Sequence, residues 1–301
     1  MKKKRYKVLI IAGGGVFGAI PAHFLASLPT TKQHLHNVDL IAGCSIGGIL
    51  TAAYASGQQF SYTYDKLLEL MPQFFDRRII ARLNPLASPT YDSSSVAAAL
   101  KSLLGNNTLG SVRSYYPDLD VIIPTLNVTD DAYKVYDNIT DQDASTKLAT
   151  IAQMTSAAPS YYSGVAHKGK CYVDGGLIEV APLLTATTAL KAKRKVPFSK
   201  MDVLMIGTGR DVAEKELTPS AYNGLTLLGL ATDVIVPYVT LSNEMATRYW
   251  GENIGYGYFN YYNPCTNNGV MDDTDQVPIV VEQAKQHEEA FKATWNEWLN
   301  K

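Results

Sequence analysis

Short apolar runs bounded by glycine or proline alternate along the chain with longer segments in which apolar residues recur at helical spacing. The runs Tyr6–Ala12, Asp39–Ala42 and Met201–Ile206 are dominated by apolar residues and predict buried strands. A helix is predicted between the first two runs, and Ile46–Ser56 predicts another. A strand, a glycine-rich turn, a helix and a second strand form a βαβ unit, which implies a parallel sheet.

The segment Gln58–Tyr116 has little strand character and predicts helices packed over one side of that sheet. Ser61–Phe75 has apolar residues at helical spacing, and a further helix, capped by Asp92 or Ser93, ends at Leu104. We therefore expect a helical insertion directly after the helix that follows the second strand.

The remainder of the chain completes an α/β pattern. Strands are predicted over Leu119–Thr129, Tyr133–Ile139, Lys170–Val173 and, at an edge, Ile254–Tyr262, and helices over Ser145–Ala157, Pro182–Lys193 and Val277–Leu299. The predicted fold class is α/β, with a mostly parallel central sheet flanked by helices. Because we find no internal repeat, low-complexity tract or clear linker, we expect a single domain over residues 1–301, with a core at about 6–265 and a C-terminal helix over 277–299.

Composition and charge narrow the classes of partner. The 301 residues are 46% apolar and 18% charged with a formal net charge of −1, so the chain has no global basic field for nucleic acid.

Three widely separated cysteines fit a reducing compartment and lack metal-ligand spacing. The cluster Lys2–Arg5 imitates the start of a signal peptide, but the apolar run after it ends at glycines without a cleavage site. The apolar stretch Leu225–Val239 is interrupted by Asp233 and Pro237 and does not predict a membrane span. We expect a cytoplasmic protein without metal or cofactor.

The sequence Gly43-Cys44-Ser45-Ile46-Gly47 lies between a predicted strand and a predicted helix. A Gly-x-Ser-x-Gly at such a turn is the pattern of the nucleophile elbow. Gly43 and Gly47 keep the strained turn free of side chains, and the helix directs its partially positive N-terminus toward an oxyanion formed on the serine. The alternative is a small-residue turn without chemistry. The rest of the chain favours Ser45 as a nucleophile.

Three glycine-rich turns each follow a predicted strand: Gly13–Gly18, Gly43–Gly48 and Asp174-Gly175-Gly176. In an open parallel sheet, ligands bind in the crevice outside the carboxyl ends of the strands. We therefore expect the three turns to meet at the same edge of the sheet. Unhindered backbone N–H groups of the first turn would there face developing negative charge.

The first turn also fits a second class of protein. Gly13, Gly15 and Gly18 match the Gly-x-Gly-x-x-Gly fingerprint of dinucleotide-binding folds, which requires an acidic residue at the end of the next strand to hold the ribose. That position is occupied by the small residues of the serine turn, and the nearby Asp39 lies at the start of the strand. Nucleotide binding through this loop is therefore the weaker hypothesis, but it stays open.

A serine nucleophile needs a base. A Ser–His–Asp triad through His287 would use a histidine on a charged terminal helix, where a solvated surface position is the simpler explanation. Asp174 is the better partner, because it ends a strand, precedes two glycines and is predicted at the same sheet edge as Ser45. The alternative is that Asp174 only caps a turn, as Asp-Gly pairs often do.

The order and spacing of these motifs resemble the patatin-like phospholipases, which are lipid acyl hydrolases with a Ser–Asp dyad. The resemblance covers about residues 6–265 and includes the Ser-Ala-Ala-Pro segment within Met154–Tyr162, the strand Met201–Gly209 and the aromatic strand Tyr258–Pro264. It implies a three-layer α/β/α fold. It also implies Ser45 as the nucleophile, Asp174 as its base, Gly13, Gly14 and Gly15 as oxyanion donors, and Gly18, Gly43, Gly47, Gly175 and Gly176 as motif glycines.

Two positions depart from the family pattern. Phe17 stands where the family often has Arg or Lys, which would either remove cationic help to the oxyanion loop or an anionic headgroup, or make the mouth of the site more apolar. Ile178–Pro182 keeps only the proline of an Asn-rich segment, so the residues that support Asp174 would differ from those of the family. The resemblance implies a membrane lipid or another acyl ester as substrate, with peripheral membrane contact. Apolar contributors would be the Gln58–Tyr116 helices, Phe17 and Leu225–Val239, for which core packing is the alternative. A non-catalytic lipid-binding protein on the same scaffold is the alternative function.

Overall fold

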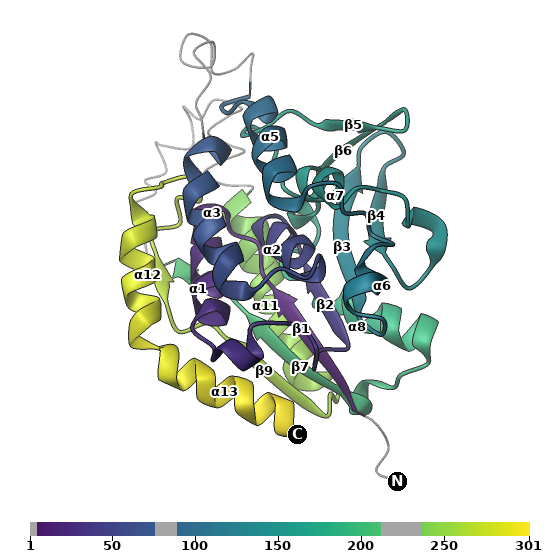
Figure 1. Ribbon diagram of the computed structural model, residues 1–301, viewed down its shortest axis with the longest axis vertical. Coiled ribbons are helices and arrows are strands. Elements are labelled where there is room, and N and C mark those ends of the chain that lie inside the picture. Colours follow the sequence, from purple (N-terminus) through teal and green to yellow (C-terminus); the bar gives the residue numbers. More distant parts are fainter. Residues whose placement is uncertain (1–4, 76–88, 212–235) are drawn as a thin grey trace.

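A β-sheet forms the centre of the molecule, and helices cover both of its faces (Figure 1). The structure is a computed structural model that describes residues 5–75, 89–211 and 236–301. Its strands are β1 (Tyr6–Ile11), β2 (Leu40–Gly43), β3 (Asp120–Asn127), β4 (Ala132–Asp137), β5 (Val165–His167), β6 (Lys170–Asp174), β7 (Met201–Ile206), β8 (Arg210–Asp211), β9 (Tyr258–Tyr262) and β10 (Thr266–Asn267). The main sheet has the order β5-β6-β3-β2-β1-β7-β9, with β4 also paired to β3, while β8 and β10 form a separate pair.

The α-helices are α1 (Ala19–Ala26), α2 (Ile46–Ala55), α3 (Phe60–Phe74), α5 (Ser93–Leu104), α6 (Val112–Tyr115), α7 (Leu148–Thr155), α8 (Leu183–Ala189), α11 (Val236–Asn253), α12 (Gln276–Gln286) and α13 (Glu288–Asn300). Short 3-10 turns include η1 (Gly15–Gly18) and η4 (Gly175–Leu177), and a π-helical turn, η5 (Leu190–Arg194), extends α8. The helices α3 and α5 follow α2 in the chain, as the predicted helical insertion requires (Figure 1).

The two faces of the sheet belong to two separate apolar cores, which makes the fold three-layered. On β1, Leu9 and Ile11 pack into the larger core with residues of α1, α2, α3, α5, α7, α12 and α13. The alternate residues Val8 and Ile10 point to the other face and pack with residues of α8. These four side chains of β1 are fully buried, which explains why the sequence of this strand is a continuous apolar run.

The sheet is mostly parallel, as predicted. The strands β3, β2, β1, β7 and β9 all run in one direction. The strands β4, β5 and β6 are antiparallel to their neighbours, and β5, which carries His167, was not predicted. The turn of the β5–β6 hairpin lies at Lys168 and Gly169, both with positive φ.

The three glycine-rich turns were expected to meet because parallel strands end at the same edge of a sheet. This reason is wrong for the third turn, because β6 is antiparallel to β3. β2 ends at Gly43, whereas β3 runs several residues beyond the level of that end, since Ala42 pairs with Ile122. β6 pairs with this overhang, and Asp174 lies opposite Thr125. Asp174 therefore lies near the carboxyl end of β2 because β6 pairs with the part of β3 that extends past that end, and not because β6 is parallel to β2.

The predicted closing helix over 277–299 is two helices, because the chain bends at His287. The first, α12, packs on α1, and the second, α13, packs on β7, so one straight helix cannot make both contacts. The Trp298 indole N–H donates to the Asp202 carbonyl oxygen in β7 at 2.8 Å, which fixes the second helix to the sheet.

Two segments named in the sequence analysis lie mainly outside the described residues. Of Lys2–Arg5, only Arg5 is described, and it pairs with Asp202. Of Leu225–Val239, only the last residues are described, as the start of α11. None of the described helices is long and apolar enough to cross a bilayer.

Candidate active site

Ser45 occupies a strained turn between β2 and α2. Its φ of 54° and ψ of −127° lie in a region that residues with a side chain rarely adopt. A Cβ at Gly43 would clash with the carbonyl oxygen of Gly47, and one at Gly47 would clash with that of Ile11 in β1. The two glycines are therefore required by close backbone packing, and the turn has the geometry of a nucleophile elbow.

Asp174 lies at the end of β6 and is almost fully buried, with 5% of its surface exposed. Its Oδ1 accepts a hydrogen bond from the Gly176 N–H at 2.7 Å and one from the Cys44 thiol at 3.6 Å. Burial raises the pKa of Asp174 to about 6, although hydrogen bonds from Gly176, Ser45 and Cys44 oppose that rise. The structure thus brings the predicted serine and carboxylate together.

Asp174 also caps η4 through its bond to Gly176, so the simpler turn-capping explanation holds as well. The two roles are compatible, because the cap and the thiol both use Oδ1. A Cβ at Gly175 would stand 2.7 Å from the Pro124 carbonyl oxygen, and one at Gly176 would stand 3.0 Å from Asp174 Oδ1. Both glycines keep side chains away from this turn.

The first glycine-rich loop passes directly beside the serine. A Cβ at Gly13 would lie 3.1 Å from the Cβ of Ser45. The Gly13 N–H, however, is donated to the Val180 carbonyl oxygen at 2.9 Å, so it is not free to meet an oxyanion. In the described part of the chain, the N–H groups of Gly14 and Gly15 have no hydrogen-bond partner. Of the three donors that the family resemblance implied, Gly14 and Gly15 remain as candidates.

Contacts from the C-terminal half hold this loop in place. The Thr208 hydroxyl donates to the Gly13 carbonyl oxygen at 2.8 Å, and the Val16 N–H donates to the Met271 carbonyl oxygen at 2.8 Å. Gly15 has a φ of 58°, and a Cβ there would clash with Met271. At Gly18, the last motif glycine, a Cβ would collide with the side chain of Ile46.

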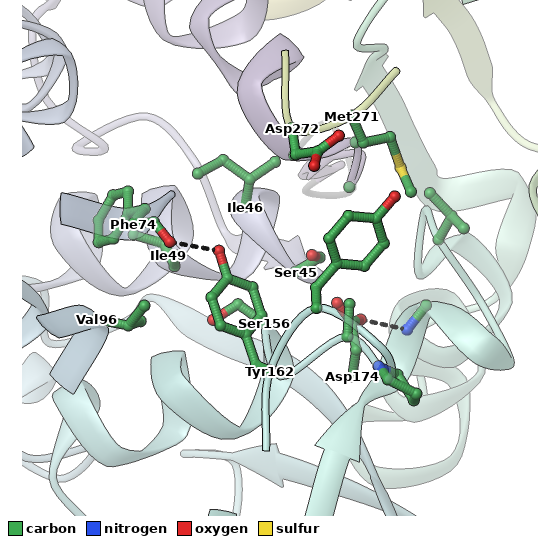
Figure 2. A pocket seen from close by; sticks show the side chains of 18 of the residues that line it. Ser45, Ile46, Ile49, Phe74, Val96, Ser156, Tyr162, Asp174, Met271 and Asp272 are labelled. Carbon is green, nitrogen blue, oxygen red and sulfur yellow. Dashed lines mark hydrogen bonds between the residues drawn. The ribbon is translucent and has the colours of Figure 1, made fainter. Parts of the chain in front are cut away.

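Ser45 and Asp174 open into one pocket that contains about 1000 Å³ of empty space, its mouth included (Figure 2). Most of its lining is apolar or aromatic, and it includes Ile46, Ile49, Phe74, Phe75, Val96, Tyr161, Tyr162, Leu177, Val180 and Met271. On one side of Ser45, Figure 2 shows Ile49, Phe74 and Val96 together, and the Tyr162 hydroxyl donates to the Phe74 carbonyl oxygen at 2.7 Å. We call this side, formed by Ile49, Phe74, Val96 and Tyr162, the apolar arm.

Met271 and Asp272 lie on the opposite side of the pocket (Figure 2), and the Tyr91 hydroxyl donates to the Asp272 carboxylate. Neither residue was predicted, because no motif marks the loop between β10 and α12. Sequence reasoning also gave no role to Cys44 or Thr155, although both lie in segments that had been singled out.

Several candidates lie away from the pocket. Phe17 is only 2% exposed, packs in the larger core and does not line the pocket, so it does not make the mouth of the site more apolar.

None of the five histidines lines the pocket. The Nε2 of His23 meets Glu288 at 2.9 Å, and His287 marks the bend between α12 and α13. Asp39 accepts a hydrogen bond from the Lys7 N–H at the start of β2. The described residues contain no cluster of His, Cys, Asp or Glu arranged to hold a metal ion.

The segment Ile178–Pro182 supports the site in its own way. The carbonyl oxygen of Val180 holds Gly13, and the Glu179 carboxylate accepts hydrogen bonds from the N–H groups of Leu184 at 2.7 Å and Thr185 at 3.3 Å in α8. Burial raises the pKa of Glu179. The segment therefore joins the glycine loop to α8 without the residues of the family pattern.

Comparison with known proteins gives a consistent result. Residues 9–187 match the family model described as patatin-like phospholipase. A cGAMP-activated phospholipase from Escherichia coli is 30% identical over 244 residues, which cover 72% of this chain and 65% of that protein. Patatin-17 from Solanum cardiophyllum is 25% identical over 274 residues, which cover 77% of this chain and 70% of that protein. The chain thus spans slightly less than two thirds of the Escherichia coli relative. Among solved structures, VipD from Legionella pneumophila aligns with a TM-score of 0.48 and 14% identity over 94% of this chain and 67% of that one.

Proposed function

The chain belongs to the patatin-like phospholipase family, and from that premise we propose that it is a lipid acyl hydrolase with Ser45 as nucleophile and Asp174 as its base. The observation that supports this most is the meeting of the two side chains in one pocket. Ser45 stands on a strained turn, and the carboxylate of Asp174, which the Ser45 hydroxyl contacts, is nearly buried. A buried carboxylate with a pKa of about 6 is a stronger base than an exposed aspartate and is still ionised at neutral pH.

In the first step, the ester carbonyl carbon lies beside Ser45 Oγ. As Oγ attacks, its proton passes to Asp174, and a tetrahedral intermediate forms with a negative charge on the former carbonyl oxygen. The N–H groups of Gly14 and Gly15, which no described residue accepts, would face that charge. Each such donor is typically worth about 3 kcal/mol of transition-state stabilisation. The two N–H donors and the carboxylate base would thus together lower the activation free energy of the attack by Ser45.

In the second step, the carbon–oxygen bond to the leaving alcohol breaks, and Asp174 returns the proton to the alcohol oxygen. An acyl group remains on Ser45. Water then attacks the acyl carbon, gives a proton to Asp174, and releases a carboxylic acid as the proton returns to Ser45 Oγ. The scheme needs no other reactant.

The pocket also supports an orientation for the substrate. A fatty acyl chain is apolar, so we place it in the apolar arm, where Ile49, Phe74 and Val96 line the space. The leaving alcohol then lies on the side of Asp272 and the mouth. Three of its four residues, Ile49, Phe74 and Val96, come from α2, α3 and α5, so the helical insertion would contribute to the proposed acyl site.

Contact with a lipid surface is part of the proposal. On α11, Met245 is 64% exposed and Tyr249 is 65% exposed, and Trp250 is exposed beside them. Tyrosine and tryptophan are suited to the interface between lipid and water. The three free cysteines, of which Cys44 and Cys265 are buried, support a reducing compartment such as the cytoplasm.

The first experiment is reaction of the purified protein with a fluorophosphonate probe, beside turnover of p-nitrophenyl butyrate. Wild type is expected to be labelled and active, whereas Ser45→Ala abolishes both and Asp174→Asn abolishes turnover. A folded wild type that is neither labelled nor active, yet binds lipid vesicles, would support the non-catalytic alternative. Mass spectrometry of products from mixed phospholipid, galactolipid and triacylglycerol vesicles, with Ser45→Ala as control, then identifies the lipid.

A further inference from the structure

Thr155 is the last residue of α7 and is completely buried behind the Ser45 turn. Its hydroxyl is the acceptor for the backbone N–H of Ser45 at 3.2 Å. The same hydroxyl donates to the carbonyl oxygen of Pro124 in β3 at 2.6 Å. One side chain thus bonds both the nucleophile turn and the neighbouring strand.

The strand contact leads directly to the base. β3 continues from Pro124 to Thr125, which is the register partner of Asp174. The Pro124 carbonyl oxygen also lies so close to Gly175 that a Cβ there would be only 2.7 Å away. The Thr155 hydroxyl therefore touches the backbone of Ser45 on one side and the backbone that carries the Asp174 turn on the other.

The hydrogen atoms can be assigned without conflict. Thr155 has one hydroxyl proton, and the short bond to Pro124 uses it, so the oxygen is free to accept from Ser45. Cys44 Sγ lies 3.7 Å from the same oxygen and 3.6 Å from Asp174 Oδ1. Because burial raises the pKa of Cys44 well above its usual value, the thiol keeps its proton and donates it to Asp174. A second, weaker link therefore joins the same two turns.

We propose that Thr155 is a positioning residue that fixes the distance between Ser45 and Asp174. The inference rests on the proposed function, in which these two side chains exchange a proton. Thr155 touches neither the substrate nor the reacting atoms, and it is absent from the pocket lining. Its effect passes through the Ser45 N–H, which is the main-chain group next to the nucleophile. A displacement of about 1 Å in such an arrangement typically costs about 10²-fold in rate.

The test compares Thr155→Val with Thr155→Ser. Valine keeps the shape but removes both hydrogen bonds, while serine keeps the hydroxyl and removes the methyl group that packs toward Gly48. With p-nitrophenyl butyrate, we expect Thr155→Val to lower kcat about 100-fold with KM within about twofold, and to slow fluorophosphonate labelling in parallel. Thr155→Ser is expected to keep kcat within about fivefold of wild type.

Thermal unfolding of each variant shows whether it is folded. A folded Thr155→Val protein with wild-type kcat would overturn the inference, and so would a Thr155→Ser protein that loses as much activity as Thr155→Val, since packing of the methyl group would then be responsible. If Thr155→Val does not fold, Thr155→Cys replaces it, and a kcat between those of wild type and Ser45→Ala is expected. Failure of the proposed function looks different, because wild type itself would then be inactive and unlabelled, and the inference would fall with it.

Discussion

Replacement of Asp174 by asparagine is expected to abolish activity and to stabilise the fold. The carboxylate is 5% exposed, and burial raises its pKa from 3.8 to about 6. The folded protein therefore binds the proton more tightly than the unfolded chain does, so ionisation of Asp174 lowers stability as the pH rises. The cost is absent below pH 3.8 and complete above pH 6. The pKa difference corresponds to about 3 kcal/mol at pH 8 and to roughly half of that at pH 5.

Asparagine is neutral at every pH and nearly the same size, and its Oδ1 can still accept the hydrogen bonds from Gly176 and Cys44. We therefore expect Asp174→Asn to raise the free energy of unfolding by up to about 3 kcal/mol at pH 8, with a smaller gain at pH 5. Urea denaturation at both pH values measures this. The matched control is Asp118→Asn, at an exposed aspartate, where no comparable gain is expected.

Two results would refute this reasoning. A gain of the same size at pH 5 and pH 8 would show that charge burial is not its source, and a loss of stability at pH 8 would show that the native carboxylate is stabilising. Turnover of p-nitrophenyl butyrate by Asp174→Asn at the wild-type rate would separately remove Asp174 as the base.

Four further outcomes are expected. The kcat/KM of wild type should rise tenfold per pH unit below about pH 6 and level off above it, because only ionised Asp174 accepts the proton; a flat profile from pH 5 to 8 would contradict this. Ser45→Ala should lower kcat by at least about 10³-fold with little change in Tm, measured by ester turnover and thermal unfolding, and substantial residual turnover would exclude Ser45. His287→Ala should keep kcat within about twofold, since no histidine lines the pocket, whereas a loss of kcat as large as that of Ser45→Ala would support a Ser–His–Asp triad through His287. Val96→Phe should shorten the apolar arm, so that kcat/KM falls about tenfold or more on a dodecanoyl ester and much less on a butyryl ester; equal losses on both would place the chain elsewhere.

The sequence was sufficient to single out the two proposed reacting groups, because each is fixed by local backbone chemistry. A strand that turns sharply into a helix with Ser45 at its tip needs glycines on both sides, and such spacing is visible in the chain. The same holds for Asp174, which is followed by two glycines in a tight turn. The reason expected for their meeting was wrong, however, since strand direction depends on pairing between distant segments. The antiparallel pairing of β6 with the overhang of β3 leaves no local pattern.

The pocket was harder to predict for the same physical reason. Phe17 lies in a predicted turn and Phe74 on a predicted helix, and both are buried in the larger core, yet only Phe74 also lines the pocket. Only the packing of the helices around the sheet separates the two cases. Likewise, the sequence shows that Gly13 has an unhindered N–H, but not that Val180, far along the chain, accepts it.

The features that support hydrolysis are all unfavourable for stability when each is taken alone. Ser45 has a positive φ, Asp174 is ionised in a site that raises its pKa, and two backbone N–H groups of the glycine loop have no partner within the described residues. A residue with positive φ typically costs about 1–3 kcal/mol. A turn that needed only a capping aspartate would have none of these costs, since an exposed Asp174 could make the same bond to Gly176. The cap therefore explains why an aspartate fits the turn but not why it is buried against Ser45, whereas the proposed chemistry on the serine would account for that burial.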